Sequence, residues 1–246
     1  MKVQIFPDAG SVAHAAAVFI AAESRAAIAA RGRFVAAFSG GSTPWLMLRA
    51  LAREEVRWDA VQVVQVDERV APAGDPERNL THLHEDLLAH TSLRSKQIHA
   101  MPVESQDLET AATQYARTIA SVAGLPPVLD LAHLGLGADG HTASLVTGDP
   151  VLDITEDDVA ITRTYQGRRR MTLTYPILNR ARRVLWLVTG VEKTAMLHRL
   201  QNGDLSIPAG RVRRDTALIF SDRVAAGTLT RLNKWVGHPV DGKEKP

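Results

Sequence analysis

Asp139 and His141 are the residues of this sequence best suited to chemistry, and both lie in the stretch GLGADGHTAS (135–144). The apolar run LDLAHL (129–134) just before it is typical of a buried strand. Histidine titrates near neutral pH, so it can take a proton from water and return it to a leaving oxygen within one cycle. Glycines stand on either side of Asp139 and let the loop carry both side chains to the edge of a sheet. We predict a catalytic role for His141 and Asp139.

The same loop matches the letters of the dinucleotide-binding fingerprint G-x-G-x-x-G at residues 135–140. In that fingerprint a long helix follows the third glycine, packs on the sheet and points its dipole at the pyrophosphate. Here TGDP (147–150) follows so soon that any helix after Gly140 would end within about two turns. The sequence therefore argues against a bound dinucleotide, and we expect no cofactor.

A second loop, SGGSTP (39–44), joins the apolar run RFVAAF (33–38) to a predicted helix. Its two glycines let the backbone turn N–H groups inward, and its hydroxyl groups and the helix N-terminus would complete a cradle for an anion. The Gly-Lys-Ser/Thr sequence of a Walker loop is absent. We predict that the loop binds a phosphate or carboxylate group through Ser39, Gly40, Gly41, Ser42 and Thr43.

Three charged residues, Asp67, Glu68 and Arg69, come directly after the apolar run VQVVQV (61–66). We expect these charges to be exposed where the strand leaves the sheet. The predicted anion-binding loop lies at the same edge, and this position favours a role in the site. The sequence leaves open whether Asp67 and Glu68 contact a substrate or only brace the loop.

Two further cations, Arg170 and Lys193, have positions that suit an anionic ligand. Lys193 stands in the first turn of a predicted helix, where a positive charge opposes the helix dipole unless an anion binds there. Arg170 begins a predicted strand and could reach the same pocket. We expect its neighbours Arg168 and Arg169 to be solvated.

Segments typical of strands and helices alternate along the chain. The predicted strands, short runs rich in Val, Ile, Leu and Phe, are residues 1–6, 33–38, 61–66, 129–136, 170–175, 183–188 and 216–221. The predicted helices are residues 12–31, 44–54, 80–90, 107–122 and 191–201. This alternation predicts an α/β fold with a Rossmann-like, mostly parallel sheet and helices on both faces, whose ligands bind beyond the carboxyl ends of the strands. We expect a single α/β domain over residues 1–232 and a polar C-terminal tail over residues 233–246.

The composition is that of an ordinary globular protein, with 45% hydrophobic and 23% charged residues in a chain of 246. There is no cysteine, which excludes disulfides, thiolate catalysis and Cys-based metal sites. No run approaches the roughly 18–20 apolar residues of a membrane span, and Pro7 and Asp8 interrupt the apolar start that a signal peptide needs. We expect a cytoplasmic protein with no membrane partner.

Arginine clusters at residues 168–170 and 182–183 suggest a nucleic-acid partner, but the formal net charge is only +2. Aromatic residues make up 5% of the chain, too few for a base-stacking platform. No group of histidines and carboxylates has the spacing of a metal site. We expect neither nucleic acid nor a bound metal.

Taken together, these loops resemble the 6-phosphogluconolactonase family, the second enzyme of the oxidative pentose phosphate pathway. The matching pieces follow the family's order over nearly the whole chain: SGGSTP (39–44), VDERVAP (66–72), GLGADGHTASL (135–145), RMTLTYPILNRAR (170–182), LVTGVEKTAML (187–197) and SDRVAAGTL (221–229). The resemblance implies the fold of the glucosamine-6-phosphate deaminase and ribose-5-phosphate isomerase type.

The chain departs from the family pattern at a few positions. It has Arg78 where the family usually has Ser before Asn79, and Val-Ala-Pro where Val-Pro often follows Asp-Glu-Arg. It has Val-Thr-Gly (146–148) where Phe-Pro-Gly is common. These differences concern the outer contacts of the loops and leave the Asp-Gly-His core unchanged.

Glucosamine-6-phosphate deaminases share Gly-x-Asp-Gly-His, so that motif alone does not discriminate between the two activities. A deaminase is expected to have a glutamate five residues after the histidine, where this chain has Val146, which cannot titrate. Deaminases also tend to have an aromatic residue after Asp-Glu, where this chain has Arg69. The lactonase interpretation is therefore favoured.

The lactonase resemblance implies hydrolysis of 6-phospho-D-glucono-1,5-lactone to 6-phospho-D-gluconate without a metal or organic cofactor. His141 would act as general base on a water and then as general acid on the ring oxygen, with Asp139 orienting the imidazole. Arg69 is the candidate stabiliser of the oxyanion. The phosphate would be held by the loop at residues 39–43 together with Arg170 and Lys193.

A non-catalytic alternative stays open, because the same fold forms the sugar-phosphate-sensing part of some bacterial regulators. Such a protein would normally carry a DNA-binding helix-turn-helix, and nothing in residues 1–32 resembles one. The presence of Asp139 and His141 also favours an enzyme. The sequence does not give the oligomeric state, and we expect a monomer or a small homo-oligomer.

Overall fold

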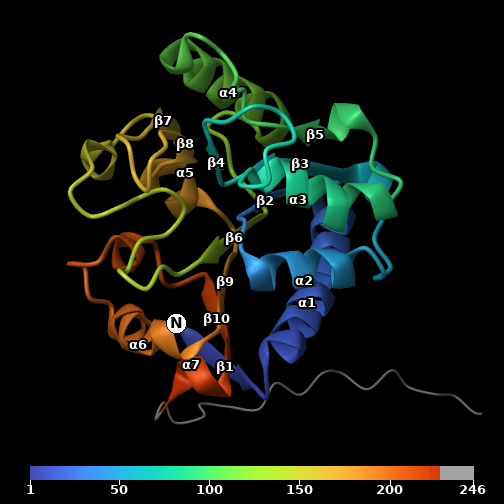
Figure 1. The fold of residues 1–246 in the computed structure, drawn as a ribbon. Helices are drawn as coiled ribbons and strands as arrows, with labels where there is room; N and C mark the ends of the chain where they lie inside the picture. Colours follow the sequence, from blue (N-terminus) through green and yellow to red (C-terminus); the bar gives the residue numbers. More distant parts are fainter. Residues whose placement is uncertain (228–246) are drawn as a thin grey trace, which may run out of the picture.

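A seven-stranded parallel sheet forms the centre of the molecule in the computed structural model, which describes residues 1–227 (Figure 1). The strand order is β1-β10-β9-β6-β2-β3-β5. The strands are β1 (Lys2–Phe6), β2 (Phe34–Phe38), β3 (Val61–Gln65), β5 (Ile98–His99), β6 (Leu131–Gly135), β9 (Val184–Val188) and β10 (Ala217–Asp222). Every residue of β2 and of β9 is buried, as expected of strands covered on both faces.

Helices cover both faces of this sheet, and each face has its own apolar core. One face packs against α1 (Ala9–Arg31), α2 (Ser42–Leu51) and α3 (Asn79–Asp86). The other face packs against α4 (Leu108–Ala123), α5 (Tyr175–Arg180), α6 (Thr194–Asn202) and α7 (Arg223–Ala226). Single 3₁₀ turns lie at Trp58–Ala60, Leu88–His90, Ser95–Gln97, Pro150–Asp153, Val191–Lys193 and Pro208–Arg211.

The order in which successive strands join the sheet changes direction between β2 and β6, which are neighbours. From β2 the chain moves outward through β3 to β5, and from β6 it moves the other way through β9 to β10. Loops that leave neighbouring strands in opposite directions open a crevice at their carboxyl ends. The two loops with the most suggestive sequences, after Phe38 and after Gly135, leave these two strands.

The long helix α1 is defined by its caps and by its apolar face. Asp8 accepts the N–H of Ser11 at 2.7 Å, and Gly32 ends the helix with a left-handed φ of 74°. By length and apolar composition alone this helix could cross a membrane, which our sequence analysis did not anticipate. Half of its most apolar stretch is buried inside the fold, and its alanines and Ile20 pack in the core beside Phe220.

A second, three-stranded antiparallel sheet covers part of the face opposite α1. Its order is β4 (Asp67–Arg69), β8 (Arg170–Leu173), β7 (Val159–Ile161). The predicted strand at residues 170–175 therefore exists but lies outside the parallel sheet. The expectation that the charges after β3 are exposed was wrong for Asp67 and Glu68, which are buried because β8 pairs alongside them.

The remaining predicted elements exist with shifted ends. The predicted helix at residues 80–90 ends at Asp86, and the one at 191–201 begins with a 3₁₀ turn. No helix begins within residues 141–149, where turns lead to the 3₁₀ turn at Pro150. The predicted tail at residues 233–246 and the last five residues of the predicted domain lie outside the described residues.

Candidate active site

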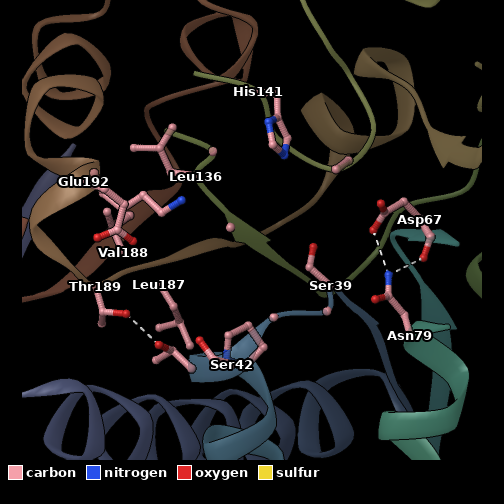
Figure 2. Close-up of a pocket in the computed structure, with 18 of the residues that line it drawn as sticks. Ser39, Ser42, Asp67, Asn79, Leu136, His141, Leu187, Val188, Thr189 and Glu192 are labelled. Carbon is pink, nitrogen blue, oxygen red and sulfur yellow. Dashed lines mark hydrogen bonds between the residues drawn. The ribbon is translucent and has the colours of Figure 1, made fainter. Parts of the chain in front are cut away.

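A cavity of about 310 Å³ lies at the carboxyl ends of β2 and β6, where the strand order reverses (Figure 2). Parallel α/β sheets bind ligands at this kind of position. All the residues predicted for the site except Asp139 line this one cavity: Ser39, Gly40, Gly41, Ser42, Thr43, Asp67, Arg69, His141, Arg170 and Lys193. Asp139 lies behind His141, outside the lining.

The loop after β2 has the shape of an anion cradle. Gly41 is the N-cap of α2 with a φ of 127°, a conformation that side chains rarely adopt. A Cβ on Gly40 would collide with the side-chain amide of Asn79, so only glycine fits there. The N-terminus of the ten-residue helix α2 therefore opens directly onto the cavity, with the exposed hydroxyl of Ser42 beside it.

Two hydrogen bonds tie this loop to neighbouring strands. The hydroxyl of Thr43 lies 2.6 Å from that of Thr189, which follows β9. The hydroxyl of Ser39 donates to the carbonyl of His133 on β6 at 3.0 Å. The cradle, which follows β2, is therefore fixed to β6 and β9, the strands on the other side of the point where the strand order reverses.

His133, on β6, is a fully buried histidine beneath the cradle. Its Nδ1 accepts the N–H of Ser39 at 3.3 Å, which leaves the proton of the neutral ring on Nε2. That Nε2 has no hydrogen-bond partner among residues 1–227. Burial lowers the pKa of His133 to about 3, so the ring stays neutral and supports Ser39 as an acceptor.

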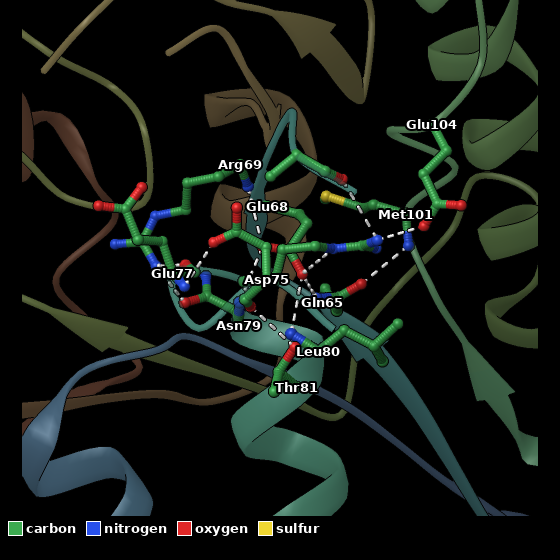
Figure 3. A network of polar contacts seen from close by, with 12 residues as sticks. Gln65, Glu68, Arg69, Asp75, Glu77, Asn79, Leu80, Thr81, Met101 and Glu104 are labelled. Carbon is green, nitrogen blue, oxygen red and sulfur yellow. Dashed lines mark hydrogen bonds and ion pairs between the residues drawn. The ribbon is translucent and has the colours of Figure 1, made fainter. Parts of the chain in front are cut away.

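One wall of the cavity is built around the carboxylate of Glu68 on β4 (Figure 3). Its two oxygens accept the backbone N–H groups of Asn79 and Leu80, each at 2.8 Å, and so cap the first turn of α3. They also accept the N–H of Arg69 and the side-chain amide of Gln65, again at 2.8 Å. Glu68 therefore braces this wall and has no exposed surface for a substrate.

Asn79 connects that brace to two polar residues of the cavity. Its amide nitrogen donates to the carbonyl and the Oδ1 of Asp67 at 2.9 and 3.2 Å. Its Oδ1 accepts from Nη1 of Arg69 at 2.7 Å. The other oxygen of Asp67 accepts the hydroxyl of Ser144 at 2.7 Å. Asp67 and Arg69 thus face the cavity in fixed positions.

The opposite wall carries the Asp139–His141 pair on the loop after β6. Nδ1 of His141 and Oδ1 of Asp139 are 2.6 Å apart, and the same oxygen also accepts the backbone N–H of His141 at 3.2 Å. An Nδ1–H that donates to the carboxylate leaves Nε2 as the unprotonated nitrogen. The imidazole lines the cavity, so the pair presents a base to whatever binds there.

Glycines make this close pair possible. A Cβ on Gly137 would lie 2.6 Å from Oδ1 of Asp139 and would also overlap Nδ1 of His141. The N–H of Gly137 donates to the carbonyl of His141 at 2.8 Å, which closes the loop. Gly140 has a φ of 86° and packs against Ile207. The glycines that suggested a dinucleotide loop allow the carboxylate and the imidazole to meet.

The electrostatics of the pair keep Asp139 ionised. Burial by itself would raise the pKa of Asp139, but the charge of His141 and the hydrogen bonds from His141 together lower the pKa of this carboxyl below its usual value. A carboxylate of this kind stabilises the imidazolium that forms when His141 takes a proton.

Two cations without carboxylate partners in residues 1–227, Arg170 and Lys193, also line the cavity. Arg170 is buried, and this burial lowers its pKa, although Asp67 nearby partly offsets the effect. Its Nη2 donates to Gln166 at 3.2 Å, while its Nε is buried without a partner in the described part of the chain. Its neighbours Arg168 and Arg169, predicted to be solvated, are partly exposed and pair with carboxylates at the surface.

Sequence reasoning missed several residues that line the cavity. Thr189 and Glu192 follow β9, and Asn79 begins α3. The rule that sites lie after the carboxyl ends of parallel strands could have indicated Thr189 and Glu192, because β9 was predicted. Nothing in the sequence reveals that Asn79 faces the same cavity. Among residues 1–227, no group of three or more histidines and carboxylates could hold a metal ion.

The chain resembles proteins of known family over most of its length. Residues 7–220 match the family model described as glucosamine-6-phosphate isomerases/6-phosphogluconolactonase. The 6-phosphogluconolactonase of Mycobacterium tuberculosis is 36% identical over 242 residues, which cover 93% of this chain and 98% of the relative.

Solved structures show the same fold. The 6-phosphogluconolactonase of Thermotoga maritima matches with a TM-score of 0.80 at 25% identity, covering 90% of this chain and 98% of that one. A monomeric glucosamine-6-phosphate deaminase matches with a TM-score of 0.81 at 19% identity, covering 92% and 99%. The fold therefore does not separate the two activities, but the chain belongs to the family of glucosamine-6-phosphate isomerases and 6-phosphogluconolactonases.

Proposed function

We propose that this chain hydrolyses 6-phospho-D-glucono-1,5-lactone to 6-phospho-D-gluconate in the oxidative pentose phosphate pathway, with His141 as general base and acid. The observation that carries this proposal is the 2.6 Å contact between His141 and Asp139, which leaves Nε2 free at a cavity that also holds an anion cradle. The lactonase relatives at 36% identity over nearly the whole chain support the same activity.

The reaction begins with a water molecule that His141 deprotonates as it attacks the lactone carbonyl. The proton moves to Nε2, and Asp139 stabilises the resulting imidazolium through Nδ1–H. The tetrahedral intermediate then collapses, and the bond between the carbonyl carbon and the ring oxygen breaks. His141 returns its proton to that oxygen, which becomes the hydroxyl of the open-chain product.

Arg69 is our candidate for stabilising the oxyanion of the tetrahedral intermediate. Its Nη1 is held by the carbonyl of Glu77 and by Asn79, each at 2.7 Å, so the guanidinium is fixed before the substrate binds. Donors fixed in advance need no reorganisation when charge develops on the substrate. The buried brace at Glu68 keeps the backbone of Arg69 in place.

The phosphate group is held at the cradle of residues 39–43 together with Arg170 and Lys193. Backbone N–H groups at the N-terminus of α2, the hydroxyl of Ser42 and two cations give a dianion several donors at once. Binding at this end would fix the sugar ring so that its carbonyl lies next to His141.

The closest alternative is a glucosamine-6-phosphate deaminase, given the shared fold and family model. That activity needs a proton shuttle for ring opening, and the residue five positions after His141 is Val146, which does not line the cavity. A non-catalytic sugar-phosphate sensor is the second alternative. In this chain, residues 9–31 form one continuous helix rather than a helix-turn-helix.

One experiment separates these functions. Purified protein is given freshly generated 6-phosphogluconolactone, and acid release is followed above the spontaneous rate. In a parallel sample it is given glucosamine 6-phosphate, and ammonia is measured. We expect acid release and no ammonia; ammonia production would support the deaminase, and binding without either product would support the sensor.

A further inference from the structure

Tyr165, in the turn between β7 and β8, contacts the Asp139–His141 pair and Arg170 without itself lining the cavity. Its hydroxyl lies 3.2 Å from Oδ2 of Asp139, the oxygen that His141 leaves free. Its ring is edge-on to the imidazole of His141, with centroids 5.7 Å apart and an interplanar angle of 66°. The guanidinium carbon of Arg170 lies 5.0 Å from the centroid of the same ring.

The backbone of this turn is tightly specified. Tyr165 and Arg168 exchange backbone hydrogen bonds, so Gln166 and Gly167 are the two central residues of a hairpin turn. Both have left-handed φ values, 51° and 81°, as a type I′ turn requires. Gln166 is not a glycine, so its conformation is held by the surrounding structure. The turn therefore sets the direction of Tyr165.

Ion pairs hold the hairpin against the rest of the protein. Arg168 contacts Asp75 at 3.1 Å and Glu77 at 2.6 Å, next to the wall that carries Arg69. Arg169 contacts Glu109 on α4 at 2.7 Å, but these side chains are 45% and 71% exposed, so this pair adds little to the attachment. The turn is thus attached mainly to the wall around β4, so its tip is positioned independently of the loop that carries Asp139.

The hydroxyl of Tyr165 is a donor in this arrangement. Burial and the adjacent Asp139 carboxylate raise the pKa of Tyr165, so it keeps its proton. Oδ1 of Asp139 accepts a hydrogen bond from His141, and Oδ2 accepts one from Tyr165, so both oxygens of the carboxylate are held. The aromatic face attracts the guanidinium of Arg170, which has no ion-pair partner among residues 1–227.

We propose that Tyr165 is a positioning residue for lactone hydrolysis, whose hydroxyl fixes Asp139 behind His141 and whose ring fixes Arg170 toward the phosphate. This inference rests on the proposed function. Its two parts act on different steps: the hydroxyl acts on the proton transfer and so on kcat, and the ring acts on substrate binding and so on KM.

The hydroxyl is tested by Tyr165→Phe, which keeps the ring. We expect kcat for lactone hydrolysis to fall about threefold to tenfold, the effect of losing one hydrogen bond, with KM unchanged. Rates are normalised to the folded fraction from circular dichroism. A wild-type kcat in this variant would overturn the role of the hydroxyl.

The ring is tested by Tyr165→Leu, which removes both features. We expect the same loss of kcat as in the Phe variant and, in addition, a KM that rises about fivefold, the effect of one cation–π contact. The dissociation constant of the product 6-phosphogluconate, measured by calorimetry, should rise by the same factor in the Leu variant and not in the Phe variant. Unchanged KM and dissociation constant would overturn the role of the ring.

Arg169→Met is the matched control, because it removes a surface ion pair from the same hairpin without touching Asp139, His141 or Arg170. Its kcat and KM should stay within about twofold of wild type. Losses as large as those of Tyr165→Phe would show that the effect comes from a disturbed hairpin and overturn the proposal. A wild-type protein that does not hydrolyse the lactone would contradict the proposed function instead, while product binding would still test the ring.

Discussion

The two polar walls of the cavity both contain carboxylates but bury them to different depths. On the wall formed by β4 and α3, Glu68 is fully buried, and four N–H groups occupy its two oxygens. On the wall formed by the loop after β6, the side chain of Asp139 is 49% exposed and that of His141 is 24% exposed. We refer to them as the braced wall and the open wall.

The difference in burial suits the two carboxylates to different tasks. Glu68 is suited to fixing the structure around it, and Asp139 is suited to assisting proton transfer. A buried carboxylate whose oxygens are all occupied cannot exchange a proton without losing several hydrogen bonds at once, so it fixes the backbone around it. A carboxylate near water that holds a histidine can stabilise a charge that appears and disappears during turnover. Changes to the Asp139–His141 pair should therefore affect rate, and changes to Glu68 should affect stability.

The largest expected effect is on the open wall. His141→Ala removes the proposed base and should lower kcat for the lactone by about 10²–10⁴-fold, with little effect on thermal stability. The control is His84→Ala, which removes an exposed histidine of α3. Unchanged turnover in His141→Ala would refute the assignment of the base.

On the braced wall, Glu68→Gln replaces an oxygen acceptor by an amide donor that faces other donors. We expect the free energy of unfolding, from urea titration, to fall by about 3 kcal/mol. Glu77→Gln, on an exposed ion pair with Arg168, should cost about 0.5 kcal/mol or less. Equal losses in the two variants would remove the distinction between buried and exposed carboxylates.

His133, beneath the cradle, should make stability depend on pH. An unfolded histidine binds a proton below a pKa of about 6.5, whereas the folded ring stays neutral down to about 3, so acid favours the unfolded chain. Between pH 7.5 and pH 5 this one residue should lower the free energy of unfolding by about 2 kcal/mol.

The variant that isolates this effect is His133→Asn, because an amide oxygen can accept the N–H of Ser39 but does not titrate in this range. Urea titrations of both proteins at the two pH values give the comparison. If wild type and variant lose the same stability on acidification, His133 is not the source of the pH dependence.

The smallest expected effect concerns Lys193, which follows β9 and lines the cavity. Lys193→Ala should raise KM for the lactone about tenfold and leave kcat unchanged, because its charge is proposed to hold the phosphate throughout the reaction. Lys96→Ala, an exposed lysine far along the chain from the cavity residues, is the control. A loss of kcat alone would argue against a phosphate-holding role.

The sequence predicted the parallel sheet and the residues of the cavity more successfully than it predicted how deeply those residues are buried. Loops such as SGGSTP and GADGH follow apolar strands, and the carboxyl ends of parallel strands meet at one edge, so their proximity could be inferred. The burial of Glu68 could not, because β4 has three residues and exists only as a partner of β8.

His133 and Tyr165 show a second limit of sequence reasoning. A single histidine in an apolar strand has no periodic signature that distinguishes a supporting acceptor from an ordinary residue. Tyr165 contacts Asp139 only because the two-residue turn between β7 and β8 lies beside the loop after β6. Both depend on contacts between distant segments, which local patterns do not encode.

The hydroxyl contact between Thr43 and Thr189 joins segments 146 residues apart, and it belongs to a cavity drawn from both halves of the chain. These segments become neighbours only when β2 and β6 have paired and β9 has joined them. No fragment containing only one half can therefore hold the substrate. Recovered turnover after dilution from denaturant would therefore report that β2, β6 and β9 have assembled, so an activity assay can follow this step of folding.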